Sequence, residues 1–262
     1  MAANKSSKST SATANHGFAH TQEQFQQLIE DTLHLARQMG ATDAAAEVSE
    51  GMGLSVSVRK QKLENVERNR DKSIGVSIYI GQRRGNASTS DFSPAALEQT
   101  VRAAFDIARY TAEDPAAGLP DVEDLALGRA AKKDLDLFHP WHIDAAEAAE
   151  LARRCEAAAL EVDRRITNSE GASVSAQQSH FFAGNTRGFR GGYASSRHSL
   201  SVSPIAGRGN DMQRDFWYSS ERSAKDLSKP EAIGRYAAER ALARLKARKI
   251  ATCEVPVLFE SP

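Results

Sequence analysis

The sequence is poor in cysteine and has no long hydrophobic run. Its 262 residues include two cysteines, Cys155 and Cys253, which belong to no C-x-x-C pair. This excludes a disulfide framework and a thiolate metal cluster, and it suits the reducing cytoplasm. No run of about 18 apolar residues occurs, and residues 1–20 are polar, without the apolar core of a secretory signal. We therefore expect a cytoplasmic protein with no membrane contact and a disordered tail at 1–20.

The chain also lacks an excess of charge of either sign. Lys+Arg and Asp+Glu number 34 each, so the formal net charge is zero. Proteins whose main role is to bind nucleic acid usually carry a net basic charge. Direct binding of nucleic acid is therefore not expected.

Motifs for catalysis or metal binding are absent as well. Seven histidines are present, but none lies in H-E-x-x-H or in the longer-spaced H-E-x-x-x-H. His139 and His142 are three residues apart in His-Pro-Trp-His, where the proline and the tryptophan favour a packed helix entry over a metal site. The glycines at 51–53 lack the third glycine of a dinucleotide fingerprint and are interpreted as a turn, and no G-x-S-x-G elbow occurs. The sequence thus predicts no catalytic residue and no metal ligand in this chain.

The apolar residues that are present have the spacing of an α+β protein. Hydrophobic residues make up 40% and charged residues 26%, and the length allows two modest domains. Helices are predicted to begin at a capping box of Thr21 and Gln24 and at Ser93–Pro94. Alternating residues between them predict strands at 54–58, 74–80 and 86–90. Residues 21–110 are therefore expected to form a domain of antiparallel sheet with helices on one face.

A change of composition divides the rest of the chain. Residues 111–127 turn to proline, glycine and acidic side chains, as in an exposed linker. Beyond it, a second capping box at Asp144 and Glu147 begins an alanine-rich helix, strand-like segments follow, and Ser228 is expected to cap a last helix. The pattern of the final residues is that of a buried strand. The second half is thus predicted to contain the linker 111–127, an α+β domain at 128–250 and, at 251–262, the first strand of a truncated third domain.

The segment 184–193 is unusually rich in glycine. Glycines at this density allow left-handed backbone or close approach to another surface. The arginines in and after it offer bidentate donors, and its aromatic residues are of the type enriched at interfaces. A pair of tight turns joining strands would account for the segment, and a peptide or partner contact is the alternative. The candidate contact residues are Arg187, Phe189, Arg190, Tyr193 and Arg197.

These segments also resemble the PmbA/TldE branch of the TldD/PmbA metallopeptidase family. The similarity extends from Phe25 to the last residue, with its motifs in consistent order. The assignment to this branch depends on residues 212–218, where TldD-like chains tend to be glycine-rich. The matching stretches are HPW (139–141), CEAA (155–158), NTRGFRGGY (185–193), SSRHSL (195–200), MQRDFWY (212–218) and the helix residues from Glu239 to Lys249.

The resemblance carries several implications. Members of the family have two N-terminal α+β domains and a larger C-terminal domain, and TldD and TldE form a heterodimer that degrades unfolded or flexible peptides. The TldD branch carries a zinc-binding H-E-x-x-x-H helix, whereas the PmbA branch lacks it and forms part of the enclosing chamber. The implied partners are a TldD-type subunit, which would hold the zinc, and flexible peptides, and no cofactor is expected in this chain.

Two other interpretations stay open at this point. The chain could belong to a metallopeptidase whose own zinc site lies beyond residue 262. It could instead belong to a regulatory protein that acts on a partner such as DNA gyrase without proteolysis, because members of the family also carry the name of DNA gyrase modulators. The non-catalytic peptidase subunit is the interpretation that the 212–218 segment favours.

Overall fold

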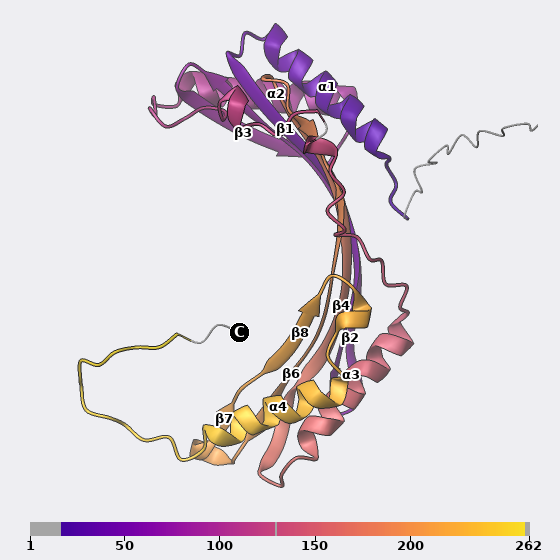
Figure 1. The fold of residues 1–262 in the computed structure, drawn as a ribbon, viewed down its shortest axis with the longest axis vertical. Helices are drawn as coiled ribbons and strands as arrows, with labels where there is room; N and C mark the ends of the chain where they lie inside the picture. The colour runs from indigo at the N-terminus through magenta and orange to yellow at the C-terminus, as the bar shows by residue number, and fades with distance from the viewer. Residues whose placement is uncertain (1–16, 129, 260–262) are drawn as a thin grey trace, which may run out of the picture.

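The computed structural model describes residues 17–128 and 130–259. In this part of the chain one eight-stranded antiparallel sheet carries four α-helices (Figure 1). The strand order is β3-β2-β1-β4-β6-β7, with β5 beside β4 and β8 beside β6. The strands are β1 (Asp43–Arg59), β2 (Lys62–Ile80), β3 (Arg83–Thr89), β4 (Ile166–Asn185), β5 (Arg190–Gly191), β6 (Ala194–Ala206), β7 (Gln213–Arg214) and β8 (Trp217–Glu221). The helices are α1 (Gln22–Gln38), α2 (Pro94–Tyr110), α3 (Ala145–Leu160) and α4 (Pro230–Ala243), so the predicted α+β class is confirmed.

Side-chain caps fix the start of two helices as the sequence predicted. The Thr21 hydroxyl accepts from the Gln24 N–H, and the Gln24 side chain accepts from the Thr21 N–H. Asp144 and Glu147 form the same reciprocal pair at α3. The predicted Ser228 cap is wrong: α4 begins at Pro230 after an N-cap residue without a side-chain cap, and the Ser228 N–H instead donates to Ser219 Oγ.

The central strands are longer than the sequence patterns predicted. Residues 51–53, interpreted as a turn, lie inside β1, where this stretch pairs with Asp71 of β2 on one side and Ser179 of β4 on the other. The turn prediction is wrong because pairing along both edges holds the glycines in extended backbone. The strand predicted at 74–80 lies within β2, and the strand predicted at 86–90 overlaps β3, which ends at Thr89.

The sheet carries two hydrophobic cores, one at each end. The α1 and α2 core contains Ala44, Ala46 and Val48 of β1, and the α3 and α4 core contains Leu54, Val56 and Val58 of the same strand. The strand 54–58, which the sequence placed in the 21–110 domain, therefore packs with the second pair of helices, because β1 runs without a break through both ends. The prediction that residues 111–127 form a linker between two domains stays a prediction.

The sheet bends into the shape of a letter C (Figure 1). Both cores use even-numbered side chains of β1, so all four helices cover the same face of the sheet. That face is on the outer side of the curve, and the inner side carries no helix (Figure 1). We call the inner side the concave face; away from the register shifts at the strand ends, its side chains are the odd-numbered residues of β1, β2, β4 and β6.

The two ends of the described chain differ from the sequence expectation. Residues 1–16 of the predicted tail lie outside the described residues, but 17–20 are packed: Phe18 is buried, and the N–H groups of Ala19 and His20 donate to Glu50. The strand expected near the C-terminus is not formed in residues 247–259, because no described strand lies beside them to pair with their backbone. Of the described helices, none has the length and apolar character that crossing a membrane requires.

Candidate functional site

The concave face is polar because serines and other polar side chains occupy many of its inward positions. Several serines of β1, β4 and β6 lie at alternate residues, and some of them pair across strands. The hydroxyl oxygens of Ser173 and Ser201 lie 3.0 Å apart, and those of Ser179 and Ser195 lie 3.3 Å apart. Short hydroxyl side chains keep this face open to an incoming chain while offering it donors and acceptors.

Two hollows of the concave face lie around the exposed side chain of Glu47. One holds about 590 Å³ and is lined by Ala45, Ser77, Asn86 and Phe189 among others. The other holds about 610 Å³ and is lined by Ser49, Ser73, Ser179 and Tyr193 among others. Volumes of this order are in the range of small-ligand sites. Phe189 and Tyr193 of the predicted contact set thus contribute to neighbouring hollows.

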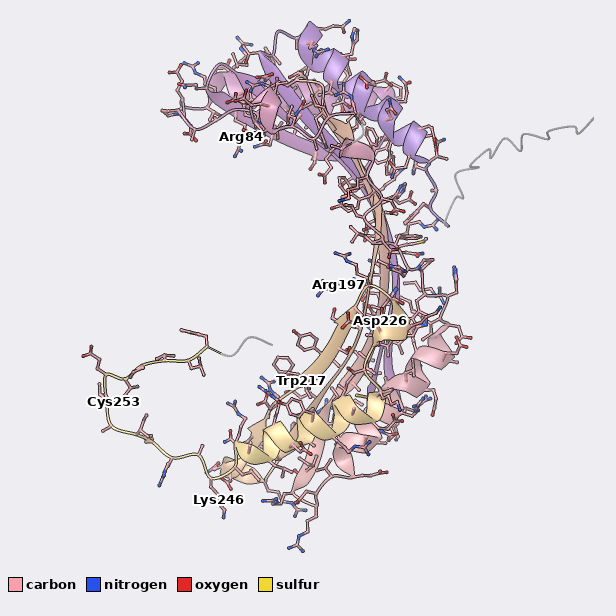
Figure 2. All side chains as sticks on the ribbon, in the orientation of Figure 1. Arg84, Arg197, Trp217, Asp226, Lys246 and Cys253 are labelled. Atoms are coloured by element: carbon pink, nitrogen blue, oxygen red, sulfur yellow. The ribbon has the colours of Figure 1, made fainter. Side chains whose placement is uncertain are left out.

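Tyr193 and Arg197 point into the curve. Tyr193 is 42% exposed and packs edge-on against Phe181, with ring centroids 4.6 Å apart. Arg197 Nε donates to Ser220 Oγ at 2.9 Å, and its side chain lies on the inner side of the curve in Figure 2. An exposed aromatic ring and a guanidinium beside hydroxyl groups form a surface typical of peptide or partner contact.

Two exposed aromatic residues at β8, Phe216 and Tyr218, are not among the contact residues predicted from the sequence. Phe216 and Tyr218 are 54% and 38% exposed and stack on the concave face, whereas Trp217 between them packs against the core of α3 and α4. The signal that could have found them is the run of three aromatic residues in a predicted strand. Successive side chains of a strand point to opposite faces of the sheet. When the middle aromatic residue is buried in the core, the two residues beside it must therefore lie on the other face.

Arg187 and Arg190 do not join this surface, because each forms ion pairs within the chain. Arg187 Nη2 lies 2.9 Å from Asp43 Oδ2. Arg190 Nε and Nη2 lie 2.6 and 2.9 Å from the two carboxylate oxygens of Glu30 on α1. The hydrogen bond from Arg190 holds the pKa of Glu30 below its ordinary range. These two arginines therefore fasten the 184–193 segment to the rest of the fold.

The histidines of the two central strands lie away from the concave face, and no metal-ligand group is found among the described residues. Within residues 17–128 and 130–259, no three His, Cys, Asp or Glu side chains are grouped to hold a metal ion. His180 and His198 occupy even positions of β4 and β6 and so lie on the opposite face from the inward serines. The described residues therefore do not form the ligand set of a catalytic zinc.

Two models of known protein domains match most of the described residues. Residues 138–245 match the PmbA/TldA metallopeptidase central domain, and residues 44–108 match PmbA/TldA metallopeptidase domain 1. The sequence is 45% identical over 235 residues to the metalloprotease PmbA of Escherichia coli O157:H7, covering 88% of this chain and 52% of that protein. It is 40% identical to the PmbA homolog of Haemophilus influenzae, covering 91% and 52%. The chain thus spans about half the length of the curated relatives it matches.

Solved structures share the fold. A Bacteroides thetaiotaomicron protein named as a modulator of DNA gyrase superposes with a TM-score of 0.77 at 26% identity, covering 88% of this chain and 52% of that one. TldE of Thermococcus kodakarensis superposes with a TM-score of 0.63 at 12% identity, covering 82% and 47%. The latter likeness is one of fold alone.

Proposed function

The chain belongs to the PmbA/TldD family, as a PmbA/TldE-type chain, and on that basis we propose that it acts as the non-catalytic subunit of a TldD/TldE-type metallopeptidase complex. In this proposal a TldD-type partner holds the catalytic zinc. The two subunits form a heterodimer in the cytoplasm and process unfolded or flexible peptides. The chain itself contacts no nucleic acid and no membrane.

The concave face is the observation that carries the proposal. It is long, polar and open, and its aromatic and guanidinium side chains, Tyr193 and Arg197, lie beside hydroxyl groups. Such a surface offers hydrogen bonds and aromatic contact to a chain of any sequence. In this proposal the catalytic zinc lies elsewhere in the complex, since the described residues contain no metal-ligand set. A wall of this kind selects for extended chains by shape rather than by sequence.

The test compares variants of the full-length protein reconstituted with a TldD-type partner. Tyr193→Ala combined with Arg197→Ala is expected to lower hydrolysis of a flexible peptide by about tenfold, since removal of an aromatic or arginine contact at an interface costs about 1 to 2 kcal/mol. Tyr110→Ala is the matched control, because Tyr110 is an aromatic side chain 83% exposed at the end of α2, on the outer side. Its activity should equal that of the unchanged complex.

The result also separates the alternatives. Equal hydrolysis and equal complex formation by all variants would contradict the role of the concave face. Chelator-sensitive hydrolysis by the full-length protein without its partner would indicate that the protein has its own zinc site. A full-length protein that alters DNA gyrase activity, with no peptide hydrolysis in any complex, would support the regulatory alternative suggested by the name of the Bacteroides thetaiotaomicron structure.

A further inference from the structure

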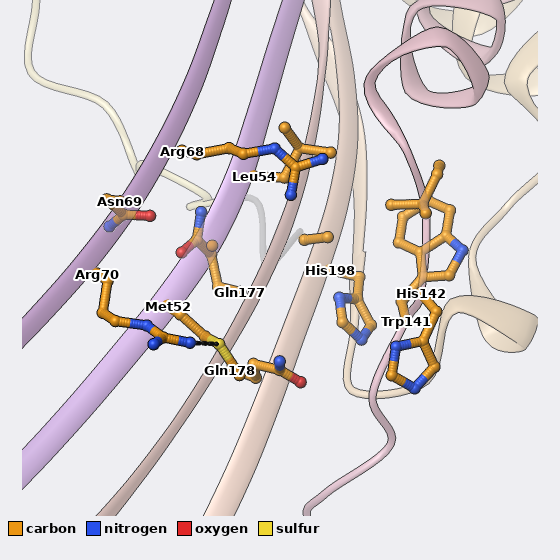
Figure 3. A pocket seen from close by; sticks show the side chains of 13 residues that line it. Met52, Leu54, Arg68, Asn69, Arg70, Trp141, His142, Gln177, Gln178 and His198 are labelled. Atoms are coloured by element: carbon orange, nitrogen blue, oxygen red, sulfur yellow. Dashed lines mark hydrogen bonds between the residues drawn. The ribbon is translucent and has the colours of Figure 1, made fainter. Parts of the chain in front are cut away.

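A third hollow lies on the opposite side of the sheet from the concave face. It is at the middle of the curve, between the two pairs of helices, and holds about 380 Å³. Its floor is the outer face of β1, β2 and β4, and the segment with Trp141 and His142 forms its far wall (Figure 3). We call it the waist pocket. Its volume is in the range of small-ligand sites.

His198 of β6 gives the waist pocket an unpaired acceptor. Its side chain is 1% exposed and lines the pocket, and Nε2 lies 2.9 Å from the carbonyl oxygen of His139. A carbonyl oxygen only accepts, so Nε2 carries a proton and donates to it, and in the singly protonated ring Nδ1 then carries a lone pair. Among the described residues Nδ1 has no hydrogen-bond partner. Buried polar atoms are nearly always paired in folded proteins, so Nδ1 is suited to accept a hydrogen bond from a bound ligand.

Two arginines make the same pocket cationic. Arg68 and Arg70 of β2 face Leu54 and Met52 of β1 in the register, and so their side chains emerge on the pocket side of the sheet (Figure 3). Arg70 Nη2 donates to the Gly17 carbonyl oxygen at 2.8 Å and is held in place. Arg68 forms no hydrogen bond or ion pair with the described part of the chain. No aspartate or glutamate lines the pocket, so nothing in it neutralises these charges.

The rest of the lining is apolar. Leu54, Ile143 and the ring of Trp141 face the hollow, and Trp141 packs edge-on against His198 with ring centroids 5.4 Å apart. An inorganic phosphate would satisfy the arginine but leave this apolar surface without contact. A ligand that uses the whole pocket has an anionic group, a hydrogen-bond donor and an apolar body close together.

Residues 1–16 of the chain, which precede Gly17 in the sequence, are poorly suited by their charge to fill the pocket. They contain two lysines and no acidic residue, and their charge has the same sign as that of Arg68. Charge therefore favours an external anion over this segment.

We propose that the waist pocket binds a carboxylate next to an N–H group and an apolar side chain, the chemistry of a free apolar amino acid or of the last residue of a peptide. Arg68 binds the carboxylate through two N–H groups, His198 Nδ1 accepts from the ligand N–H, and the side chain packs on Trp141 and Leu54. This site is independent of the proposed peptidase role, because it lies on the other face of the sheet and its test measures binding alone.

Isothermal titration of the full-length protein with small probes tests each part of the recognition. N-acetylleucine offers the carboxylate, the N–H and the apolar group, and is expected to bind with a measurable affinity. Its amide, which lacks the carboxylate, and 4-methylpentanoate, which lacks the N–H, are each expected to bind at least about tenfold more weakly. Free leucine and a tripeptide ending in leucine then distinguish the two natural sources, since only the tripeptide has its N–H in an amide.

Variants assign the binding to these side chains. Arg68→Ala should weaken N-acetylleucine at least about tenfold, with Arg68→Lys intermediate, because lysine cannot form a bidentate contact. Arg84→Ala, at an exposed arginine on the concave face (Figure 2), is the control and should bind like the unchanged protein. The proposal is overturned if no probe binds, if the amide binds as well as the acid, if phosphate binds in place of the acid, or if Arg84→Ala weakens binding as much as Arg68→Ala.

Discussion

Arg187 and Asp43 form an ion pair that joins the turn after β4 to the start of β1, with Nη2 and Oδ2 2.9 Å apart. The same guanidinium donates through Nη1 to the carbonyl oxygens of Leu119 and Pro120 at 3.1 and 3.0 Å. The Arg187 side chain thus connects the 111–127 segment to the sheet through hydrogen bonds and an ion pair. A segment without helix or strand over most of its length depends on such contacts for its position.

Arg187→Ala is therefore expected to expose the linker. Limited proteolysis should cut the unchanged protein first before Thr21 and next within 111–127, and the variant should be cut in 111–127 several times faster. Arg84→Ala removes an arginine that makes no contact with the linker and serves as the control. Cleavage in the linker at equal rates in both variants, or earlier cleavage within 74–80, would contradict the expectation.

A glycine in β3 allows a close approach of α2 to the sheet. A Cβ atom at Gly85 would collide with the Ala104 carbonyl oxygen and the Ala108 nitrogen of α2, whereas a Cβ at Gly75 of β2 would meet nothing within 4 Å. Gly85→Ala is expected to lower the free energy of unfolding by about 1 to 3 kcal/mol, because the helix must move away from the sheet. Gly75→Ala should change it by less than about 1 kcal/mol. Urea denaturation of both variants measures the difference, and equal values would be inconsistent with the packing.

The elements that local sequence specifies were predictable. The capping boxes at Thr21 and Asp144 are each formed by two residues three positions apart in the sequence. The alternation of apolar residues at 74–80 indicates a strand with one face packed against the core. The course of β1 through residues 51–53 was not predictable, because glycine favours turns locally and only pairing with two distant strands holds it extended.

Part of the candidate site was also predictable, because a local sequence pattern indicates which face of the sheet a side chain occupies. Tyr193 and Arg197 lie in strand-like alternation with serines, and the structure places both on the concave face. The internal role of Arg190 depends on Glu30, 160 residues earlier in the chain, and no pattern in the sequence pairs them. The waist pocket combines residues of β2 and β6 with the 138–143 segment, and it exists only once the sheet has formed.

The two cysteines are expected to react very differently. Burial raises the pKa of Cys155 to about 12, with the nearby charges of Glu231 and Glu156 acting in the same direction, whereas Cys253 is exposed. The thiolate is the reactive form, so at pH 8 the native protein should take up one iodoacetamide, at Cys253. Mass spectrometry after modification in denaturant should show two. Rapid native modification of Cys155 would mean that α3 opens readily.

Glu50 is expected to make stability depend on acid pH. Its side chain is 2% exposed. Burial pulls the pKa of Glu50 upward, but hydrogen bonds from the Ala19 and His20 N–H groups and from the His20 and His180 rings outweigh it, and the pKa lies below its ordinary value. A carboxylate whose folded pKa is depressed stabilises the protein above its unfolded pKa of about 4.3, and this contribution disappears as pH falls through the folded value.

Glu50→Gln should therefore lower the free energy of unfolding by about 2 to 3 kcal/mol at pH 7, because it weakens a buried set of hydrogen bonds to a charged group. The difference from the unchanged protein should shrink as the pH falls below about 4. Glu47→Gln, at an exposed position of the same strand, is the control and should have little effect at either pH. A difference that is the same at pH 7 and pH 3.5 would exclude this ionic contribution.

The last prediction is that the 262-residue chain binds no stoichiometric zinc. Zinc sites in proteins use three or four His, Cys, Asp or Glu ligands, and the described residues contain no such group. The His139 ring is engaged by Asp136, with Nε2 3.1 Å from its carbonyl oxygen. That leaves His142 and His198 as the histidines that line the waist pocket, where no acidic residue or cysteine could complete a ligand set. Elemental analysis of protein purified without a histidine tag should find well under one zinc per chain, both in the unchanged chain and in His142→Ala. Close to one zinc per chain, lost in His142→Ala, would identify the waist pocket as a metal site and overturn both this prediction and the carboxylate proposal.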